Sequence, residues 1–229
     1  MMSGMAGRRA RSEGAKADRR LAIVTAAGSV FDSAGIDGFR MADVAGAVGL
    51  SKAALYRYFS TRESLLLALT VDELDAFFDR VDLQASASIE QPDDAADACA
   101  EWVSGAALAS RRLIRLQGLT SPILERNIDV ATAIAFKTWL MERCVATGTL
   151  LAARCAALPE TGVRFLIHFQ LLVVGLDSHL HPAPPVAVAL ETPALAAFRL
   201  DGPVELRHGA RALARATLVP TPTTPRSTR

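Results

Sequence analysis

Cysteine and aromatic residues are scarce in this chain. Three cysteines stand among 229 residues, and aromatic side chains make up 6% of the total. Cys99, Cys144 and Cys155 lack the C-x-x-C spacing of a metal site and lie in apolar helical contexts, so we interpret them as buried reduced thiols. We expect no metal and no cofactor. Oxidant sensing by one of the three cysteines stays open as an alternative.

Long apolar runs and strand patterns are also missing. The longest apolar stretch, 165–176, is interrupted by His168 and Gln170 and is too short to cross a bilayer. The first twenty residues lack the apolar segment of a secretory signal, so we expect a cytoplasmic protein. Alternating Val, Ile and Thr are rare, whereas Ala, Leu and Arg are abundant, and this composition predicts an all-α fold.

The net charge of +1 hides an uneven distribution. Residues 1–62 contain ten Lys or Arg and five Asp or Glu, whereas residues 63–229 contain fifteen and nineteen. A basic N-terminal part joined to an acidic body indicates that the first part contacts a polyanion.

Helical periodicity predicts three short helices near the N-terminus. They cover residues 19–33, 41–48 and 51–59, and Gly49 ends the second of them. Ser51 is a natural N-cap for the third helix. Two short helices joined by a tight turn are typical of a helix-turn-helix motif.

The outward face of the third predicted helix carries small, cationic and aromatic side chains. These are Ser51, Lys52, Ala53, Ala54, Tyr56 and Tyr58. Small side chains let a helix enter the major groove, Lys52 can reach a phosphate or a guanine edge, and tyrosine hydroxyls can donate to phosphates. The segment therefore predicts binding to double-stranded DNA.

The rest of the chain is predicted to be helical as well. The expected helices cover 63–83, 93–110, 111–117, 123–157 with a pause at 127–129, 161–180 and 203–218. Residues 181–200 contain four prolines and are expected to form a loop. We expect a flexible basic arm over 1–18, a helix-turn-helix DNA-binding domain over 19–66, a helical ligand-binding and dimerisation domain over 67–219, and a disordered tail over 220–229.

Residues 19–66 resemble the DNA-binding domain of the tetracycline-repressor (TetR) family. The matching residues are Phe31, Gly35, Val44-Ala45, Leu50-Ser51-Lys52, Leu55-Tyr56-x-Tyr58-Phe59, Arg62-Glu63 and Leu65-Leu66. The resemblance implies an all-helical homodimer of nine or ten helices per chain. It also implies that Lys52, Ala54, Tyr56 and Tyr58 occupy DNA-contacting positions and that Arg62 lies near a phosphate.

Two departures from the family pattern change the expected DNA contacts. Arg40 stands where Thr or Ser commonly caps the second helix, so a cap is lost and a possible phosphate contact is gained. Ala53 and Ala54 replace a common Gly-Thr or Gly-Ser pair, which leaves Ala54 only apolar contact with a base. We therefore expect Arg40 and Lys52 to supply more of the affinity.

The C-terminal domain is predicted to sense a small, largely apolar effector. The candidate ligand-binding residues are bulky side chains on its helices: Trp102, Phe136, Trp139, Met141, Phe165, His168 and Phe169. The family resemblance implies that the last two helices pair with those of a second copy. A two-fold dimer would place two recognition helices on successive major grooves, which agrees with this expectation. We predict a transcriptional regulator that represses until the effector releases it from a palindromic operator.

Two other classes of protein compete with this prediction. An enzyme is not expected, because the sequence has no nucleophile elbow and no Gly-rich phosphate loop. A helical protein that binds small molecules without binding DNA remains the alternative. A steep fall of DNA affinity with salt and a preference for a palindrome would distinguish the regulator from it.

Overall fold

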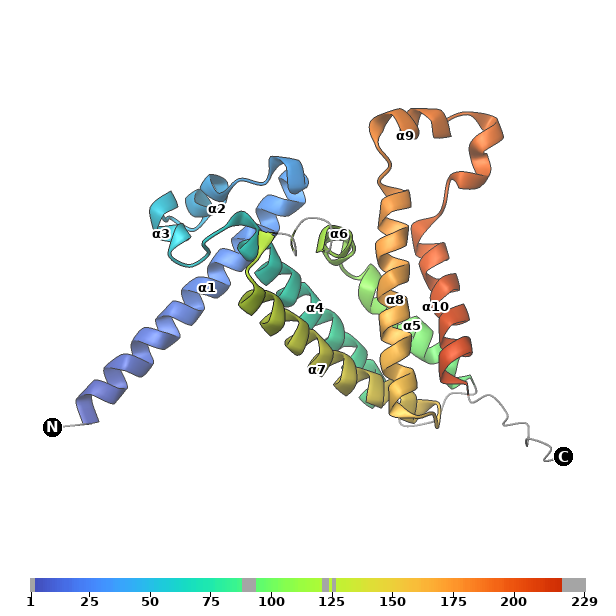
Figure 1. Ribbon diagram of the computed structural model, residues 1–229, viewed down its shortest axis with the longest axis horizontal. Coiled ribbons are helices and arrows are strands. Elements are labelled where there is room, and N and C mark those ends of the chain that lie inside the picture. Colours follow the sequence, from blue (N-terminus) through green and yellow to red (C-terminus); the bar gives the residue numbers. More distant parts are fainter. Residues whose placement is uncertain (1–2, 88–93, 121–123, 125–126, 220–229) are drawn as a thin grey trace. The chain divides into compact units, whose positions relative to one another are not determined.

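The structure is a computed structural model that describes residues 3–87, 94–120, 124 and 127–219, with side chains from residue 14 onward. All regular structure in these residues is helical, which confirms the predicted all-α class (Figure 1). The predicted disordered tail, 220–229, lies outside them.

Ten α-helices and one 3₁₀ helix follow one another in the described residues. They are α1 (Ser3–Gly38), α2 (Met41–Ala47), α3 (Lys52–Tyr56), α4 (Arg62–Ala87), α5 (Ala95–Leu108), α6 (Arg111–Leu119), α7 (Val130–Arg154), α8 (Pro159–Leu180), α9 (Pro184–Leu190), the 3₁₀ helix Pro193–Phe198 and α10 (Gly202–Leu218).

The chain divides into two compact units. The first comprises Met1–Glu73 with Leu119–Asp129, and the second comprises Leu74–Gly118 with Val130–Arg229. The boundary falls within α4, so this single helix contributes to both units.

In the first unit, α1, α2, α3 and the start of α4 surround one apolar core. Phe31 of α1, Val44 of α2, Leu55 of α3 and Leu66 of α4 are all completely buried. Gly35 interrupts α1 with a φ of 64°, a backbone conformation that favours glycine.

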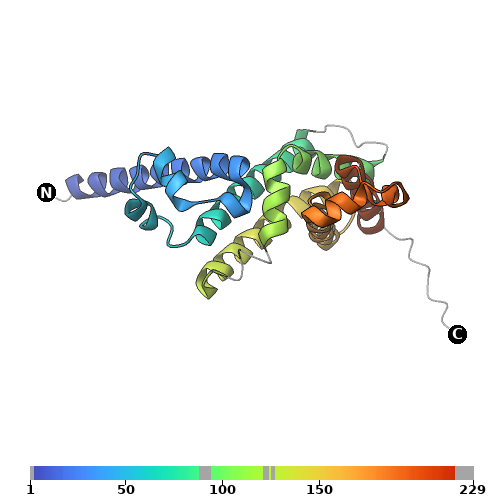
Figure 2. The same ribbon diagram turned by 90° about the horizontal axis from the view of Figure 1, so that it is seen from above.

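α1 is longer than predicted. We expected its first turn near Arg19 and a flexible arm before it, but the helix begins at Ser3 and extends well beyond α2 and α3 (Figure 2). Residues 3–18 contain four Ala, three Arg and no proline, which favour a helix, although three Gly lower its propensity and it has no apolar periodicity.

In the second unit, α8 packs against both α7 and α10, and α10 also packs against α5. α8 is the one helix, among those the structure describes, with the length and hydropathy of a membrane span. Its apolar residues Phe165, Phe169 and Val173 are buried inside the unit.

The expected loop at 181–200 is partly helical. It contains α9 and the 3₁₀ helix, and no side chain of either is buried. Both helices carry proline in their first turn, where its fixed φ suits a helix and its missing N–H costs no hydrogen bond.

Candidate DNA interface and ligand pocket

The turn between α2 and α3 is closed by local hydrogen bonds. Gly49 has a φ of +67°, and the Leu50 amide donates to the Ala45 carbonyl at 2.8 Å, which caps the end of α2. The Ser51 hydroxyl accepts from the Ala54 amide at 3.1 Å and caps the start of α3. The predicted N-cap is therefore confirmed.

The residues predicted to face DNA are all at least partly exposed in this motif. Ser51, Lys52, Ala53 and Tyr56 are exposed, while Ala54 and Tyr58 are half-buried. The Lys52 ammonium lies 5.9 Å from the centre of the Tyr56 ring, so the cation and the aromatic ring form a joint surface.

Arg40 is exposed and occupies the N-cap position of α2 with extended backbone angles. The structure shows no side-chain hydrogen bond that caps this helix, as the loss of Thr or Ser at this position predicts. The guanidinium is thus displayed beside the motif at the positive end of a short helix.

The Arg62 side chain is bonded to other residues of the first unit. Its Nε lies 3.1 Å from the Glu63 carboxylate, and its Nη1 donates to the Ile36 carbonyl at 3.4 Å. A DNA phosphate would therefore compete with Glu63 for this side chain, a constraint that the resemblance alone did not indicate.

Arg20 is a structural residue that the sequence analysis missed. Its guanidinium lies 4.1 Å from the centre of the Phe59 ring and donates to the Tyr58 carbonyl at 3.3 Å, so α1 fixes the turn that follows α3. Burial lowers the pKa of Arg20 from its ordinary value. Arg20 lies 38 residues from Tyr58 in the sequence, and no local pattern indicates the contact.

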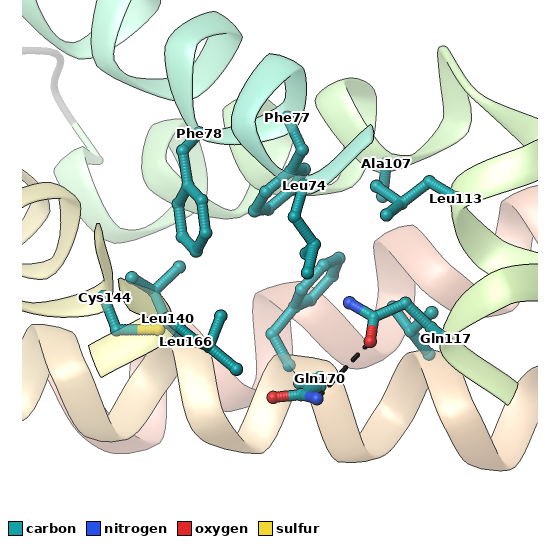
Figure 3. A pocket seen from close by; sticks show the side chains of 12 residues that line it. Leu74, Phe77, Phe78, Ala107, Leu113, Gln117, Leu140, Cys144, Leu166 and Gln170 are labelled. Carbon is teal, nitrogen blue, oxygen red and sulfur yellow. Dashed lines mark hydrogen bonds between the residues drawn. The ribbon is translucent and has the colours of Figure 1, made fainter. Parts of the chain in front are cut away.

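The second unit contains an apolar cavity of about 30 Å³ (Figure 3). Its lining comes from α4, α5, α6, α7 and α8: Leu74, Phe77, Phe78, Ala107, Leu113, Gln117, Leu140, Cys144, Leu166, Phe169, Gln170 and Val173. This volume holds one or two water molecules, so a larger guest requires the walls to separate.

Two amides supply the polar contact in this wall. Gln170 Nε2 donates to Gln117 Oε1 at 3.4 Å, as the dashed line in Figure 3 shows. Burial raises the pKa of the Cys144 thiol to about 11, so this lining residue stays protonated at neutral pH.

The seven predicted ligand residues do not converge on this cavity. Phe169 lines it, whereas Phe136 and Trp139 stack on each other with ring centres 6.3 Å apart, and Met141 is 53% exposed. Trp102 lies on a separate open groove of about 350 Å³ on α4 and α5.

Phe165 is completely buried and His168 is half-buried. Sequence reasoning missed Phe77 and Phe78. Their apolar spacing in the helix over 63–83 was visible, but it indicated only core packing.

Two models of protein families together match most of the chain. Residues 23–69 match "Bacterial regulatory proteins, tetR family", and residues 71–219 match "Tetracyclin repressor-like, C-terminal domain". The chain belongs to the TetR family and is a DNA-binding transcriptional regulator. No curated protein sequence gives a significant match.

Solved structures of such regulators share the fold. The multidrug binding protein EbrR, complexed with imidazole, is 20% identical with a TM-score of 0.55, and the match covers 90% of this chain and 97% of EbrR. A possible TetR-family regulator from Streptomyces coelicolor A3(2) is 21% identical with a TM-score of 0.54, covering 86% and 97%. A putative TetR-family regulator from Mesorhizobium loti MAFF303099 is 19% identical with a TM-score of 0.50, covering 89% and 96%.

Proposed function

We propose that this regulator is a repressor that binds a palindromic operator as a homodimer and leaves it when a small, largely apolar molecule enters the cavity. The continuity of α4 is the observation that supports this most directly. Leu65, Leu66 and Leu69 belong to the core of the first unit, and Phe77 and Phe78 of the same helix line the cavity in the second. A guest that displaces these rings acts on a helix shared with the DNA-binding unit.

The proposed DNA contacts lie in a domain over 19–66. They are Arg40, Ser51, Lys52, Ala53, Ala54, Tyr56, Tyr58 and Arg62. The exposure of Arg40 and Lys52 supports a leading role for these two cations. The α3 cap supports a preformed recognition helix, which lowers the entropy lost on binding.

Effector binding and dimerisation are assigned to a domain over 67–219. Leu166, Phe169 and Val173 of α8 are buried in the core of their own chain. Ile167 and Leu171, one helical turn apart on α8, are 42% and 65% exposed instead. This exposed apolar pair, next to α10, supports pairing through the last two helices.

The cavity chemistry supports the class of effector. Its aromatic and aliphatic walls favour an apolar body, and the amides of Gln117 and Gln170 can bind one polar group if they exchange their mutual hydrogen bond for bonds to the guest. A difference of about 3 kcal/mol between the affinities of the two states weakens DNA binding roughly 150-fold.

Operator selection from genomic fragments, followed by fluorescence anisotropy, tests the DNA-binding step. Lys52→Ala and Arg40→Ala should each weaken operator binding roughly tenfold and make the salt dependence shallower. Arg199→Ala is the matched control, because it removes one exposed positive charge in the second unit. Operator affinity that is unchanged in the Arg40→Ala/Lys52→Ala double variant contradicts the proposed interface.

Two further measurements test the remaining parts. Sedimentation should show a dimer that Leu171→Glu dissociates. A screen of small apolar compounds should find effectors that release wild-type protein from the operator. Gln117→Leu should change which polar groups the effectors carry, while the free protein keeps its operator affinity. A monomer that binds the operator as tightly as the wild type contradicts the dimeric mechanism.

A further inference from the structure

Two of the three cysteines meet in the second unit although they lie 56 residues apart in the sequence. Cys99 of α5 and Cys155, the residue after α7, have their sulfur atoms 3.8 Å apart. A disulfide needs an S–S distance of about 2.05 Å, so the sulfurs must approach each other by a little under 2 Å. Side-chain rotation and a small backbone shift at one partner can supply this movement.

The backbone around Cys155 is suited to such a shift. The Cys155 amide donates to the Ala152 carbonyl at 3.0 Å, and the Ala157 amide donates to the same carbonyl at 2.9 Å. Ala156 has a φ of 49°, so α7 ends here in a left-handed residue. Cys155 therefore lies at a helix end and not within a regular helix, whereas Cys99 is fixed inside α5.

The two thiols differ in exposure and in acidity. Cys99 is completely buried, while Cys155 is only half-buried. The hydrogen bond with Cys99 lowers the pKa of Cys155 below its ordinary value. The same hydrogen bond, together with burial, raises the pKa of Cys99. Cys155 is thus the better nucleophile, and Cys99 is its adjacent thiol partner.

We propose that Cys99 and Cys155 form a peroxide-oxidisable dithiol, in which Cys155 reacts first and Cys99 then closes an intramolecular disulfide. In the first step the Cys155 thiolate attacks one peroxide oxygen, the O–O bond breaks, and Cys155 sulfenic acid and hydroxide result. In the second step the Cys99 sulfur attacks the sulfenic sulfur, the S–OH bond breaks, and the Cys99 proton leaves with the hydroxyl group as water. Two thiols lose two electrons in total, and one peroxide is reduced to two molecules of water.

The resulting bond would join α5 to the end of α7. Both helices supply walls of the cavity, Ala107 from α5 and Leu140 and Cys144 from α7. Oxidation therefore restricts how far these walls can separate, a consequence that rests on the proposed effector function, whereas the dithiol chemistry does not.

Thiol counting on the purified full-length chain tests the proposal. Hydrogen peroxide should lower the number of free thiols from three to one in a chain that stays monomeric on a non-reducing gel, and dithiothreitol should restore all three. Cys144→Ser is the matched control, and its thiol count should fall from two to none by the same reaction. A count that stays at three in the wild type, or a disulfide between two chains as the main product, would overturn the proposal.

Single variants test the order of the two steps. In Cys99→Ser, dimedone should trap a sulfenic acid on Cys155, located by peptide mass spectrometry. In Cys155→Ser, Cys99 should give at least tenfold less adduct, because it is buried. Circular dichroism verifies that both variants are folded. Equal trapping at the two positions in folded variants would contradict the assigned order. None of these measurements involves DNA or an effector, so they can fail without affecting the proposed function.

Discussion

The two units place their polar groups in opposite ways. In the DNA-binding unit, the cationic residues Arg40 and Lys52 are exposed to solvent. The apolar residues Val44 and Leu55 of the same motif are completely buried. In the second unit, Gln117 belongs to the wall of an apolar cavity and reaches the Gln170 amide from a neighbouring helix.

The proposed function explains this difference by what each unit would bind. A duplex presents fixed phosphates, so the protein can keep its cations in water until DNA replaces that water. A small apolar guest gains affinity only where water is excluded, and the few polar groups there must be satisfied before it arrives. Under the proposed function, the first unit can therefore be rigid, whereas the second has to open to admit the guest.

Gly162→Ala should have the largest effect and should act on the second unit. The added Cβ would overlap the Gly148 carbonyl, so α7 and α8 would have to separate. We expect a loss of about 3 kcal/mol or more in the free energy of unfolding, measured by urea denaturation. Gly175→Ala on the same helix is the control, because its Cβ meets nothing within 4 Å. Similar losses in both variants would contradict a tight helix crossing.

Leu55→Ala should act on the first unit instead. Leu55 is the completely buried residue of the recognition helix α3, so its truncation should cost roughly 2–3 kcal/mol and abolish operator binding. Leu21→Ala makes the same chemical change at a side chain that is 58% exposed and should cost less than about 0.5 kcal/mol. Binding of a hydrophobic dye to the second unit should survive in both variants, and its loss in Leu55→Ala would show that the units do not fold separately.

Arg143→Met measures the electrostatic contribution in the second unit. Arg143 Nη2 lies 2.7 Å from Asp79 Oδ1 and 3.6 Å from Asp82 Oδ2, and its Nε lies 3.4 Å from Asp75 Oδ1. Methionine retains the packing of the stem but leaves three carboxylates close together on α4. The expected cost is about 1.5 kcal/mol at low salt and less at high salt, measured by thermal unfolding. Arg199→Met, at an exposed site, should be neutral, and a loss independent of salt would argue against this cause.

Ser51→Ala should have the smallest effect and should separate helix capping from base contact. Loss of the hydroxyl that accepts from the Ala54 amide should cost about 1 kcal/mol and weaken operator binding several-fold, because α3 is less well formed. Ser60→Ala changes an exposed serine at the other end of the motif. Ser51→Ala should be less stable and bind the operator more weakly than Ser60→Ala, measured by urea denaturation and fluorescence anisotropy. Equal stability of the two variants would contradict the capping role of Ser51.

The helix-turn-helix unit was predictable because its determinants are local. The turn at Gly49 and the cap at Ser51 use hydrogen bonds between groups no more than five positions apart. The apolar periodicity that predicts α3 also predicts that Leu55 is buried, as it is. Arg20 shows where this reasoning ends. Its contact with Tyr58 depends on how α1 crosses the turn, and a sequence window of one helix contains only one of the partners.

The cavity was not predictable for the same reason. Gln117 and Gln170 lie 53 residues apart, and their meeting depends on the packing of α6 against α8. The sequence identified apolar helices correctly but could not show which apolar side chains border free space. Phe169 was the predicted residue that lines the cavity, whereas Phe77 had only the signature of an ordinary core position.

Helices α7 and α8 approach each other closely where Gly148 meets Gly162. Near their connecting turn the two backbones are in contact and cannot move closer, so a change in the angle between the helices would have to pivot at this crossing. Val130, the first residue of α7, is 18 residues from Gly148, a lever of about 27 Å at 1.5 Å per residue. A swing of about 5° would thus carry Val130 by roughly 2 Å, and Val130 is covalently attached to Asp129, a residue of the DNA-binding unit.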